Sequence, residues 1–329
     1  MLKAAHLLDD FGMGGVTRAL TVFENTKLAQ TASSEIVPVT STAKLAPALN
    51  VDVIVDHMAL SWRRLAFLLS LRLRNPKAAI VHVEHSYTKA FEASQVYSRS
   101  RFRTMIRISA LLFDKIVCVS NAQRDWMRDC VGIPASKLKV IYPWSGRLDL
   151  QSISAPSPRN GRPLRLLAYG RYAAVKNFDS LIAAMQSFRA DEVDLTVFGD
   201  GPDREALTEM AKRMPHVTIS GPTDQLDAYL ENCDAVIMPS HYESFGLVAT
   251  EARLAGRAII VADVDGLPEQ ASSGIVTKLR TPTEIVSAIQ KARRAPLAAM
   301  GAAGREDVCN QHKDILAGWS QLFKELAKG

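Results

Sequence analysis

Short apolar runs alternate with longer amphipathic stretches along the whole chain. Apolar runs of roughly four to eight residues, closed by polar or turn residues, are typical of strands buried on both faces. Such runs occur at Lys3–Leu8, Ile36–Val39, Val51–Val55, Ala78–Val83, Lys115–Val119, Lys139–Tyr142, Leu164–Tyr169, Leu195–Phe198, Val217–Ser220, Ala235–Met238 and Ala258–Val261. Helices are expected at Val16–Ala29, Gly246–Leu254, 281–308 and Gln311–Leu326. This alternation predicts an α/β protein with parallel sheets covered by helices on both faces.

The length of 329 residues fits two domains better than one. A stretch rich in Ser, Pro, Asn, Gly and Arg without hydrophobic periodicity, residues 151–163, predicts a linker. The sequence therefore divides into a first domain over residues 1–150 and a second over 164–308. The amphipathic C-terminal stretch, residues 309–329, predicts a separate helix.

Candidate chemistry concentrates in the stretch Met238–Gln270. It predicts a strand end, a loop, a helix from about Gly246, a second strand and a second glycine loop. Glu243 lies in the first loop and Glu251 lies inside the helix. The start of this helix offers free backbone N–H groups and a positive dipole end, which suit a phosphate or a sugar oxygen.

Glu243 and Glu251 are separated by seven residues within P-S-x-x-E-S-F-G, followed by E-A, a strand and G-L-P-E. This segment resembles the signature of the retaining glycosyltransferases of family 4. The resemblance implies the GT-B fold, with two Rossmann-like parallel-sheet domains facing a central cleft. It also implies that the first domain binds the acceptor, that the second binds a nucleotide sugar, and that the C-terminal helix crosses back to the first domain.

Three further segments resemble motifs of this family: the glycine loop Phe11–Gly15, Gly170-Arg171 with Lys176 five residues later, and the G-x-G-P of Gly199–Pro202. Two cations at a strand end suit a diphosphate leaving group, whose negative charge grows in the transition state. By this resemblance, Arg171 and Lys176 hold the diphosphate. The remaining nucleotide-binding candidates are Gly14, Gly15, Gly199, Gly201, Pro202, Ser244, Phe245, Gly246, Leu247 and Glu251, with Glu251 at the ribose.

The same resemblance assigns the sugar hydroxyls to Glu243 and the orientation of the donor sugar to His85, which follows a predicted strand end. The candidate catalytic residues are thus Glu243, His85, Arg171 and Lys176. His82 alternates toward the sheet and is expected to be packed. His82 and His85 lack a third metal ligand in the sequence, so a metal site is not predicted there.

Three features set limits on the resemblance. Trp144 stands where the family has an asparagine, which puts a donor contact in doubt, and Asn177 replaces the usual glycine after the lysine. Asp263-Val264-Asp265 mimics the metal-binding D-x-D of another glycosyltransferase fold, but its place after a strand argues for coincidence. No metal and no cofactor is expected, only a donor such as a UDP- or GDP-sugar.

The net charge of +6 is unevenly distributed. Between Trp62 and Arg107 ten basic residues face only Glu84 and Glu92; the basic residues are Arg63, Arg64, Arg72, Arg74, Lys77, Lys89, Arg99, Arg101, Arg103 and Arg107. They flank apolar groups, namely Leu65, Phe67, Leu68 and Leu71 in one predicted helix and Phe102, Met105 and Ile106 in another. An apolar stripe edged with arginine suits an anionic membrane surface, and a soluble anionic acceptor is the alternative. No nucleic-acid recognition motif accompanies the charge.

The four cysteines, Cys118, Cys130, Cys233 and Cys309, lie far apart without metal-ligand spacing, and no apolar run reaches the length of a membrane span. With no signal peptide at the N-terminus, these features predict a cytoplasmic protein, peripheral at the inner face of the membrane.

The function expected from the sequence is sugar transfer from a nucleotide sugar to a sugar, lipid or lipid-linked acceptor, in bacterial glycolipid, lipopolysaccharide or polysaccharide synthesis. Two alternatives stay open. One is a nucleotide-sugar epimerase of the same fold, which would act on the donor without an acceptor. The other is a non-catalytic partner subunit that has kept the fold.

Overall fold

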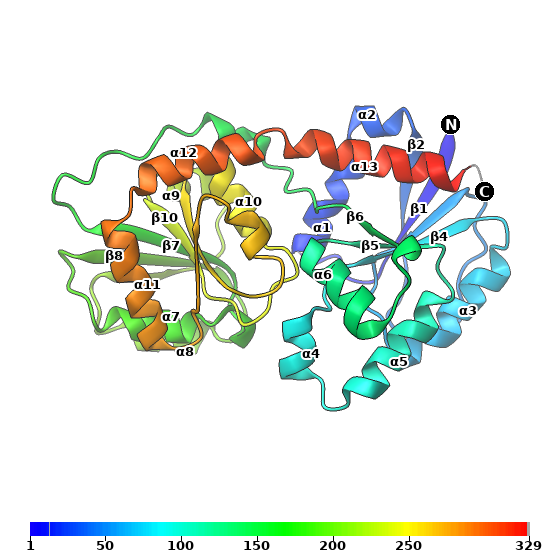
Figure 1. Ribbon diagram of the computed structural model, residues 1–329, viewed down its shortest axis with the longest axis horizontal. Coiled ribbons are helices and arrows are strands. Elements are labelled where there is room, and N and C mark those ends of the chain that lie inside the picture. The colour runs from blue at the N-terminus through cyan, green and yellow to red at the C-terminus, as the bar shows by residue number, and fades with distance from the viewer. Residues whose placement is uncertain (13, 328–329) are drawn as a thin grey trace. The chain divides into compact units, whose positions relative to one another are not determined.

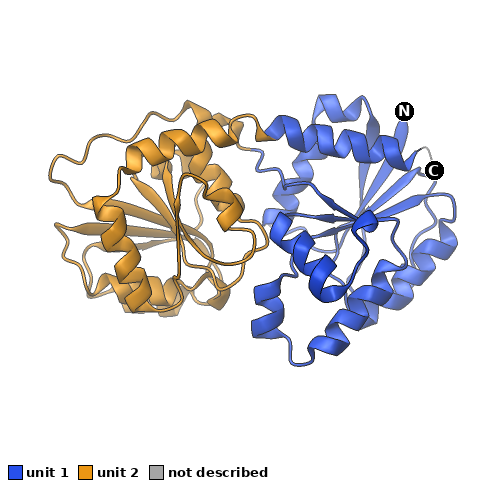
Figure 2. Cartoon of the chain, viewed as in Figure 1, with its two compact units in different colours: residues 1–146, 312–329 blue, residues 147–311 orange. Residues whose placement is uncertain are grey.

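The computed structural model describes residues 1–12 and 14–327 and divides the chain into two compact units (Figure 2). Unit 1 comprises residues 1–146 together with the chain from His312 onward, and unit 2 comprises Arg147–Gln311. Ile153, inside the predicted linker, and Leu150, directly before it, are both buried in the core of unit 2. The chain thus enters unit 2 through packed apolar residues.

Unit 1 is built on a six-stranded sheet in the order β2-β1-β3-β4-β5-β6, in which every pair is parallel. Its strands are β1 Leu2–Leu8, β2 Ala32–Pro38, β3 Val53–Asp56, β4 Ala79–Glu84, β5 Lys115–Cys118 and β6 Leu138–Val140. Their runs of buried residues follow from burial on both faces of the sheet.

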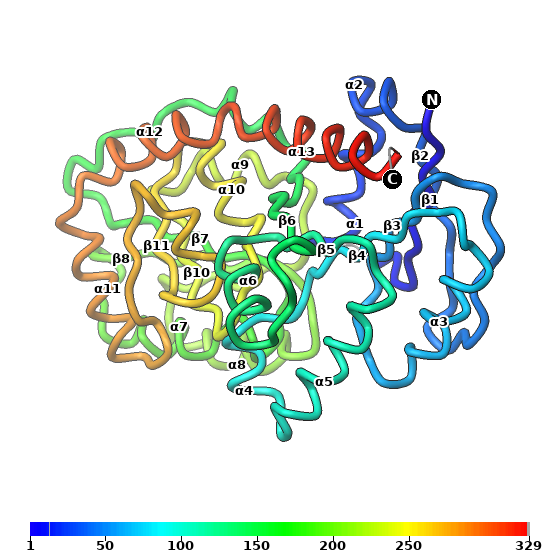
Figure 3. The backbone as a smooth tube through the Cα atoms, turned by 45° about the vertical axis from the view of Figure 1, so that its right-hand side comes forward, coloured from blue at the N-terminus to red at the C-terminus, as the bar shows by residue number. Residues whose placement is uncertain are grey.

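The helices of unit 1 lie around this sheet (Figure 1). They are α1 Gly15–Leu20, α2 Thr26–Ala29, α3 Leu65–Arg74, α4 Lys89–Gln95, α5 Arg99–Ala110, α6 Asn121–Trp126 and α13 Gln311–Leu326. The C-terminal helix α13 lies beside α1 and α2 in both Figure 1 and Figure 3. Trp319 meets Phe23 edge-on at 4.8 Å between ring centroids, and the Ser320 and Thr31 hydroxyls are 2.9 Å apart. These contacts join the two ends of the sequence within one unit.

The single helix predicted over Val16–Ala29 is wrong, because the chain breaks at Asn25. After α1 it tightens into a 3-10 turn at Thr21–Glu24, and Asn25 then adopts an extended conformation with φ −67° and ψ 128°. The Asn25 side chain accepts a hydrogen bond from the Lys27 N–H and so caps α2. Asparagine competes with helical backbone bonds in this way, which favours a new helix start.

Unit 2 repeats the architecture, with a parallel six-stranded sheet in the order β12-β11-β10-β7-β8-β9. Its strands are β7 Leu164–Arg171, β8 Val193–Asp200, β9 Val217–Ser220, β10 Ala235–Met238, β11 Ala258–Ala262 and β12 Ile275–Thr277. Its helices are α7 Phe178–Met185, α8 Arg204–Ala211, α9 Leu226–Glu231, α10 Leu247–Leu254, α11 Pro282–Arg294 and α12 Leu297–Val308. The predicted α/β class with two Rossmann-like parallel sheets is confirmed.

Residues 281–308, expected to be helical, are divided between two helices. They form α11 and α12, separated at Ala295 and Pro296. Ala295 is extended, with φ −81° and ψ 154°, because the residue before a proline is disfavoured in the α region. The three-residue edge strand β12 was not predicted, since its apolar run is too short to stand out.

The apolar stripes expected to face a membrane are corrected by the structure. Phe67, Leu68 and Leu71 of α3, and Met105 and Ile106 of α5, are buried in the core of unit 1. They pack toward the sheet because an amphipathic helix buries its most apolar face there. Other apolar side chains on these helices are exposed instead: Leu69, Leu73, Ile108 and Leu111, together with Trp62 just before α3.

The basic residues of this region also divide into two groups. Arg64 is buried against Asp9 and Asp56, and Arg72 donates to the Leu112 carbonyl and pairs with Asp114. Arg103 pairs with Glu92, and Arg107 donates to the Val131 carbonyl. These four arginines all contact other residues of unit 1. Arg63, Arg74, Lys77, Lys89, Arg99 and Arg101 are exposed. No helix among the described residues is long and apolar enough to cross a membrane.

Candidate active site

Beyond the carboxyl ends of β7 and β10 in unit 2, a lysine and a glutamate form an ion pair. Lys176, in a 3-10 turn after β7, places its Nζ 2.5 Å from Oε2 of Glu243, in the loop after β10. Both side chains are only partly buried. Arg171, at the end of β7, has an exposed side chain. This edge of the sheet therefore presents cations that a ligand from solvent can reach.

Two glycines allow the ends of β7 and β8 to approach each other closely. Gly199, at φ +151°, pairs with Gly170, and a Cβ on it would lie 1.9 Å from the Gly170 carbonyl oxygen. A Cβ on Gly201, at φ +154°, would lie 2.3 Å from the Tyr172 carbonyl oxygen. Only glycine fits both the space and the backbone conformation at these positions. The G-x-G-P motif is thus explained by backbone packing, and a role beside a nucleotide remains a prediction.

The loop that carries Glu243 is held by the loop that follows β11. The Glu243 N–H donates to Oδ2 of Asp265 at 3.2 Å, and its carbonyl accepts from the Gly266 N–H at 3.2 Å. The buried Gln270 side chain donates to the Gly246 carbonyl at 3.3 Å. Gly246 has φ +88°, and a Cβ there would lie 2.7 Å from Leu267. The turn before α10 is therefore shaped by contacts that the sequence motif alone does not reveal.

Glu251, the second glutamate of the motif, is fully buried in α10. Its Oε2 accepts a hydrogen bond of 2.9 Å from the Tyr169 hydroxyl. The Tyr169 ring in turn stacks on Phe198, with centroids 4.9 Å apart and planes within 7°. Tyr169 and Phe198 come from the adjacent strands β7 and β8, so this stack fixes where the hydroxyl points. Ser244, Phe245 and Leu247 lie on the turn between the two glutamates.

Asn177, where the family has glycine, adopts the left-handed conformation with φ +56° and ψ +34°. Asparagine is one of the few non-glycine residues that tolerate this region. Its buried side chain also donates to the Leu279 carbonyl at 2.8 Å. The departure from the motif therefore keeps the backbone geometry after Lys176.

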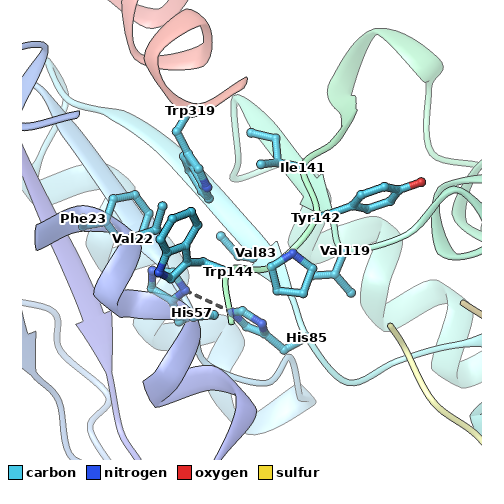
Figure 4. Close-up of a pocket in the computed structure, with 12 residues that line it drawn as sticks. Val22, Phe23, His57, Val83, His85, Val119, Ile141, Tyr142, Trp144 and Trp319 are labelled. Atoms are coloured by element: carbon cyan, nitrogen blue, oxygen red, sulfur yellow. Dashed lines mark hydrogen bonds between the residues drawn. The ribbon is translucent and has the colours of Figure 1, made fainter. Parts of the chain in front are cut away.

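Unit 1 holds the other three predicted site residues. Gly14 precedes α1 in an extended conformation, and Gly15 is the first residue of that helix. His85 follows β4 and lines a pocket together with His57, Phe23, Trp144 and Trp319, among other residues (Figure 4). Trp144 is buried, so the residue that departs from the family pattern is a wall of this pocket rather than an exposed side chain.

His85 belongs to a row of three histidines in unit 1. His6 Nδ1 lies 3.0 Å from His57 Nε2, and His57 Nδ1 lies 3.1 Å from His85 Nε2. Burial lowers the pKa of His6 to about 3 and that of His85 to about 4. Burial, and then the nearby histidines, lower the pKa of His57 well below its usual value. All three rings are neutral at physiological pH.

His82 is buried, as predicted, but unlike these three rings it is protonated at physiological pH. Its Nδ1 lies 3.0 Å from Oδ2 of Asp56 and its Nε2 lies 3.4 Å from Oε2 of Glu84. Burial alone would lower the pKa of His82, but the two hydrogen-bonded carboxylates outweigh it and raise the pKa to about 9. Glu84 also accepts from the Ser86 and Tyr87 N–H groups at 2.8 and 2.9 Å, which fixes the turn that carries His85.

The structure thus groups Lys176 with Glu243, and Glu251 with the turn of α10, at one edge of unit 2. Residues that the sequence analysis did not single out support these groups and His85: Tyr169, Asp265 and Gln270 in unit 2, and His6 and His57 in unit 1. A usable signal was present for His57, because it directly follows the buried strand β3, just as His85 follows β4. Over residues 1–12 and 14–327, no group of three or more His, Cys, Asp and Glu is arranged to hold a metal ion.

Comparison with known proteins gives consistent matches. HepE of Anabaena, crystallised with UDP and glucose, superposes with a TM-score of 0.77 at 15% identity and full coverage of both chains. Sucrose-phosphate synthase of Thermosynechococcus elongatus gives 0.76 at 18% identity, covering 99% of each chain. With the two parallel six-stranded sheets, these similarities define the GT-B fold.

Two protein-family models also match the chain. Residues 29–144 match the model described as Glycosyltransferase Family 4, and residues 163–294 match the model described as Glycosyl transferases group 1. Together these matches show that the chain belongs to the family 4 glycosyltransferases.

Curated relatives match parts of the chain at low identity. Glycogen synthase of Mycobacterium tuberculosis is 28% identical over 198 residues, which are 56% of this chain and 47% of that protein. D-inositol 3-phosphate glycosyltransferase of Segniliparus rotundus is 36% identical over 151 residues, which are 41% and 34% of the two chains. The chain spans about half or less of the length of these relatives.

The histidines of unit 1 predict how stability depends on pH. The His82 pKa is raised from about 6.5 to about 9, so its contribution is fully present below about pH 6.5 and is lost as the pH rises toward 9. His6, His57 and His85 have lowered pKa values, so the unfolded chain binds more protons as the pH falls below about 6.5. We expect the free energy of unfolding in urea to peak near pH 6.5.

The variant His82→Gln should flatten the alkaline decline between about pH 6.5 and 8.5, since the slope per linked proton is about 1.4 kcal/mol per pH unit. His216→Gln in unit 2, where His216 contacts the Met185 carbonyl, is the matched control. Parallel alkaline limbs for wild type and His82→Gln would contradict the assignment.

Proposed function

We propose that this chain is a retaining glycosyltransferase that moves a sugar from a nucleoside diphosphate to an acceptor hydroxyl. The observation that carries the proposal is the Lys176–Glu243 pair beyond the carboxyl ends of β7 and β10. Ligands of parallel α/β sheets bind at this edge. Glu243 lies in the segment that resembles the family's signature, and HepE, a structural neighbour of this fold, was crystallised with UDP.

The leaving diphosphate requires fixed positive charge. As the bond between the sugar and the phosphate breaks, negative charge grows on the phosphate oxygen, and preorganised cations stabilise it. Arg171 supplies an exposed guanidinium and Lys176 an ammonium whose present partner is a single carboxylate. When the diphosphate binds, its oxygens replace that carboxylate, and Glu243 becomes available to the donor sugar.

The reaction needs little further chemistry from the protein. The departing phosphate oxygen accepts the proton of the acceptor hydroxyl on the same face of the sugar, which retains the anomeric configuration. The chain contributes positioning and electrostatic stabilisation. Glu251 receives the ribose, Gly14 and Gly15 border the diphosphate, and His85 orients the donor sugar. The donor is a UDP- or GDP-sugar, and no metal takes part.

The acceptor is a lipid-linked or glycolipid hydroxyl of bacterial envelope synthesis, reached from an anionic membrane surface. Support comes from a surface formed by α3 and α5, called the α3–α5 surface. It comprises the exposed residues Trp62, Arg63, Leu69, Leu73, Arg74, Lys77, Arg101, Ile108 and Leu111. Leu73 is 69% and Leu111 is 76% exposed, and the Arg72 bond to Leu112 brings the ends of α3 and α5 together.

Exposed leucines edged by basic residues suit the interface of an anionic bilayer, because the leucines enter the apolar region and the cations meet the headgroups. The guanidinium of Arg101 lies 5.8 Å from the centre of the Trp62 ring, which joins the two helices at the other end of this surface.

Loss of the lysine should slow the chemical step. For Lys176→Ala we expect kcat to fall about a hundredfold or more, as for loss of one oxyanion donor. Initial rates with a UDP-sugar and a glycolipid acceptor measure this, and the donor alone serves to detect epimerisation or hydrolysis. Lys291→Ala, an exposed lysine on α11, is the matched control. Near-normal turnover in a folded Lys176→Ala protein would remove Lys176 from the mechanism.

Metal removal should leave the rate unchanged. Asp265, the second aspartate of the D-x-D sequence, accepts a hydrogen bond from the Glu243 N–H, so its carboxylate already has a structural task. We therefore expect turnover with excess EDTA to stay within about twofold of turnover without it, because no metal ion supplies a catalytic charge. Loss of activity that manganese or magnesium restores would instead make Asp263 and Asp265 metal ligands.

Membrane binding should depend on the exposed cations of the α3–α5 surface. Replacing Arg63, Arg74 and Lys77 by Glu should lower affinity for anionic vesicles about a hundredfold or more, since each basic residue contributes about 1 kcal/mol. Sedimentation with anionic and neutral vesicles at two salt concentrations measures this.

The control replaces three exposed basic residues of unit 2, Arg213, Lys291 and Arg294, by Glu, which changes the net charge equally. Equal losses in both variants would point to net charge rather than to this surface. No sedimentation of the wild type with anionic vesicles at low salt would end the proposal.

A further inference from the structure

The row of His6, His57 and His85 crosses three adjacent strands of unit 1. His6 lies in β1, His57 directly follows β3 and His85 directly follows β4, and these strands are neighbours in the sheet. Both pairs of neighbouring rings are inclined by 26°, with centroids 5.3 and 5.4 Å apart. Figure 4 shows His57 and His85 joined by their hydrogen bond at the pocket wall. The three rings form one hydrogen-bonded chain.

A chain of neutral imidazoles has only two proton arrangements. Each neutral ring carries one N–H donor and one acceptor nitrogen, so His57 can donate to one neighbour only. Either the protons point toward His85, with His57 Nδ1–H donating to His85 Nε2, or they all point toward His6. The tautomer of His85 therefore depends on the direction of the whole row.

The buried end of the row favours one direction. His6 Nε2 is buried and has no hydrogen-bond partner. If the protons pointed toward His6, this atom would be an unpaired N–H donor; in the other direction it is an unpaired acceptor. Among backbone groups, orphaned buried N–H donors are rarer than under-satisfied acceptors, and we apply the same preference to the imidazole nitrogens. This favours the direction toward His85, in which His85 Nε2 accepts and the His85 proton lies on Nδ1.

The charged groups close to the row bond to one another and, through Glu84, to the backbone. His82 bridges Asp56 and Glu84, and Arg64 lies 3.6 Å from both Asp56 and Asp9. Glu84 fixes the turn that carries His85 through two backbone N–H groups. The position of the His85 backbone is therefore set independently of His57, whereas its ring is oriented by the bond from His57.

We propose that His57, with His6 behind it, is a positioning residue that holds His85 as the tautomer protonated on Nδ1. The proposal rests on the proposed function in one respect, namely that His85 orients the donor sugar. A ring held in one tautomer presents the same donor nitrogen in every turnover, whereas an unfixed ring must be ordered each time the sugar binds.

The direct test is the nitrogen NMR spectrum of the imidazoles in the full-length protein, labelled at histidine. In the wild type we expect the His85 Nδ1 signal to be of the protonated type and the Nε2 signal of the unprotonated type. His85→Gln assigns the signals. Finding the proton on Nε2 of His85 in the wild type would overturn the proposal without any further variant.

Two substitutions of His57 separate positioning from packing. His57→Phe keeps a ring but removes both nitrogens, so the His85 signals should shift toward a mixture of tautomers, and kcat should fall about tenfold with little change in KM, the effect of about one hydrogen bond. In His57→Asn the amide nitrogen occupies nearly the place of Nδ1 and can still donate. It should restore both the tautomer and most of the rate.

His216→Gln in unit 2 is the control for loss of a histidine. Equal rates and equal His85 signals in His57→Phe and wild type would contradict the proposal. If sugar transfer fails in the wild type, the tautomer result still stands on its own, so failure of the positioning role and failure of the proposed function are distinguishable.

Discussion

A parallel sheet buried on both faces has no room for an unpaired polar side chain along its strands, because such a group would lose its hydrogen bonds to water. Polar chemistry is therefore displaced to the carboxyl ends of the strands. Lys176 and Glu243 stand just beyond such ends in unit 2, as His57 and His85 do in unit 1. Buried polar side chains that do lie within strands, among them His6, Asp56, His82 and Glu84, are hydrogen-bonded to one another or to the extension of a neighbouring strand.

This constraint explains how much the sequence could predict. Most strand positions were predictable because double burial leaves continuous apolar runs. The loop that carries Glu243 was predictable because Pro239 and Ser240 close the strand before it. The close approach of β7 and β8 could not be predicted, although the glycines that permit it are present in the sequence. The contact between Gly199 and the Gly170 carbonyl joins residues that are distant in the sequence. Helix ends were less predictable, since the break at Asn25 depends on one side chain capping the next helix.

Supporting residues were missed for a different reason. The side chains of Asp265 and Gln270, which follow β11, bond to backbone groups of the turn that carries Glu243. No spacing in the sequence predicts such a bond. Tyr169 supports Glu251 from a strand 82 residues away. The apolar faces of α3 and α5 were predicted wrongly because adjacent residues of a helix point in different directions. In α3, Leu68 is buried and Leu69 is exposed. The residue types were right, but the assigned faces were wrong.

The two halves of the predicted site solve the same electrostatic problem in opposite ways. In unit 2, Lys176 and Glu243 are kept as a partly exposed ion pair, so neither charge is left alone before a ligand arrives. In unit 1, His6, His57 and His85 are kept neutral by burial, while His82 alone is charged between two carboxylates. Burial disfavours a protonated ring unless carboxylates lie beside it, so the three rings without such partners stay neutral and His82, between Asp56 and Glu84, is charged.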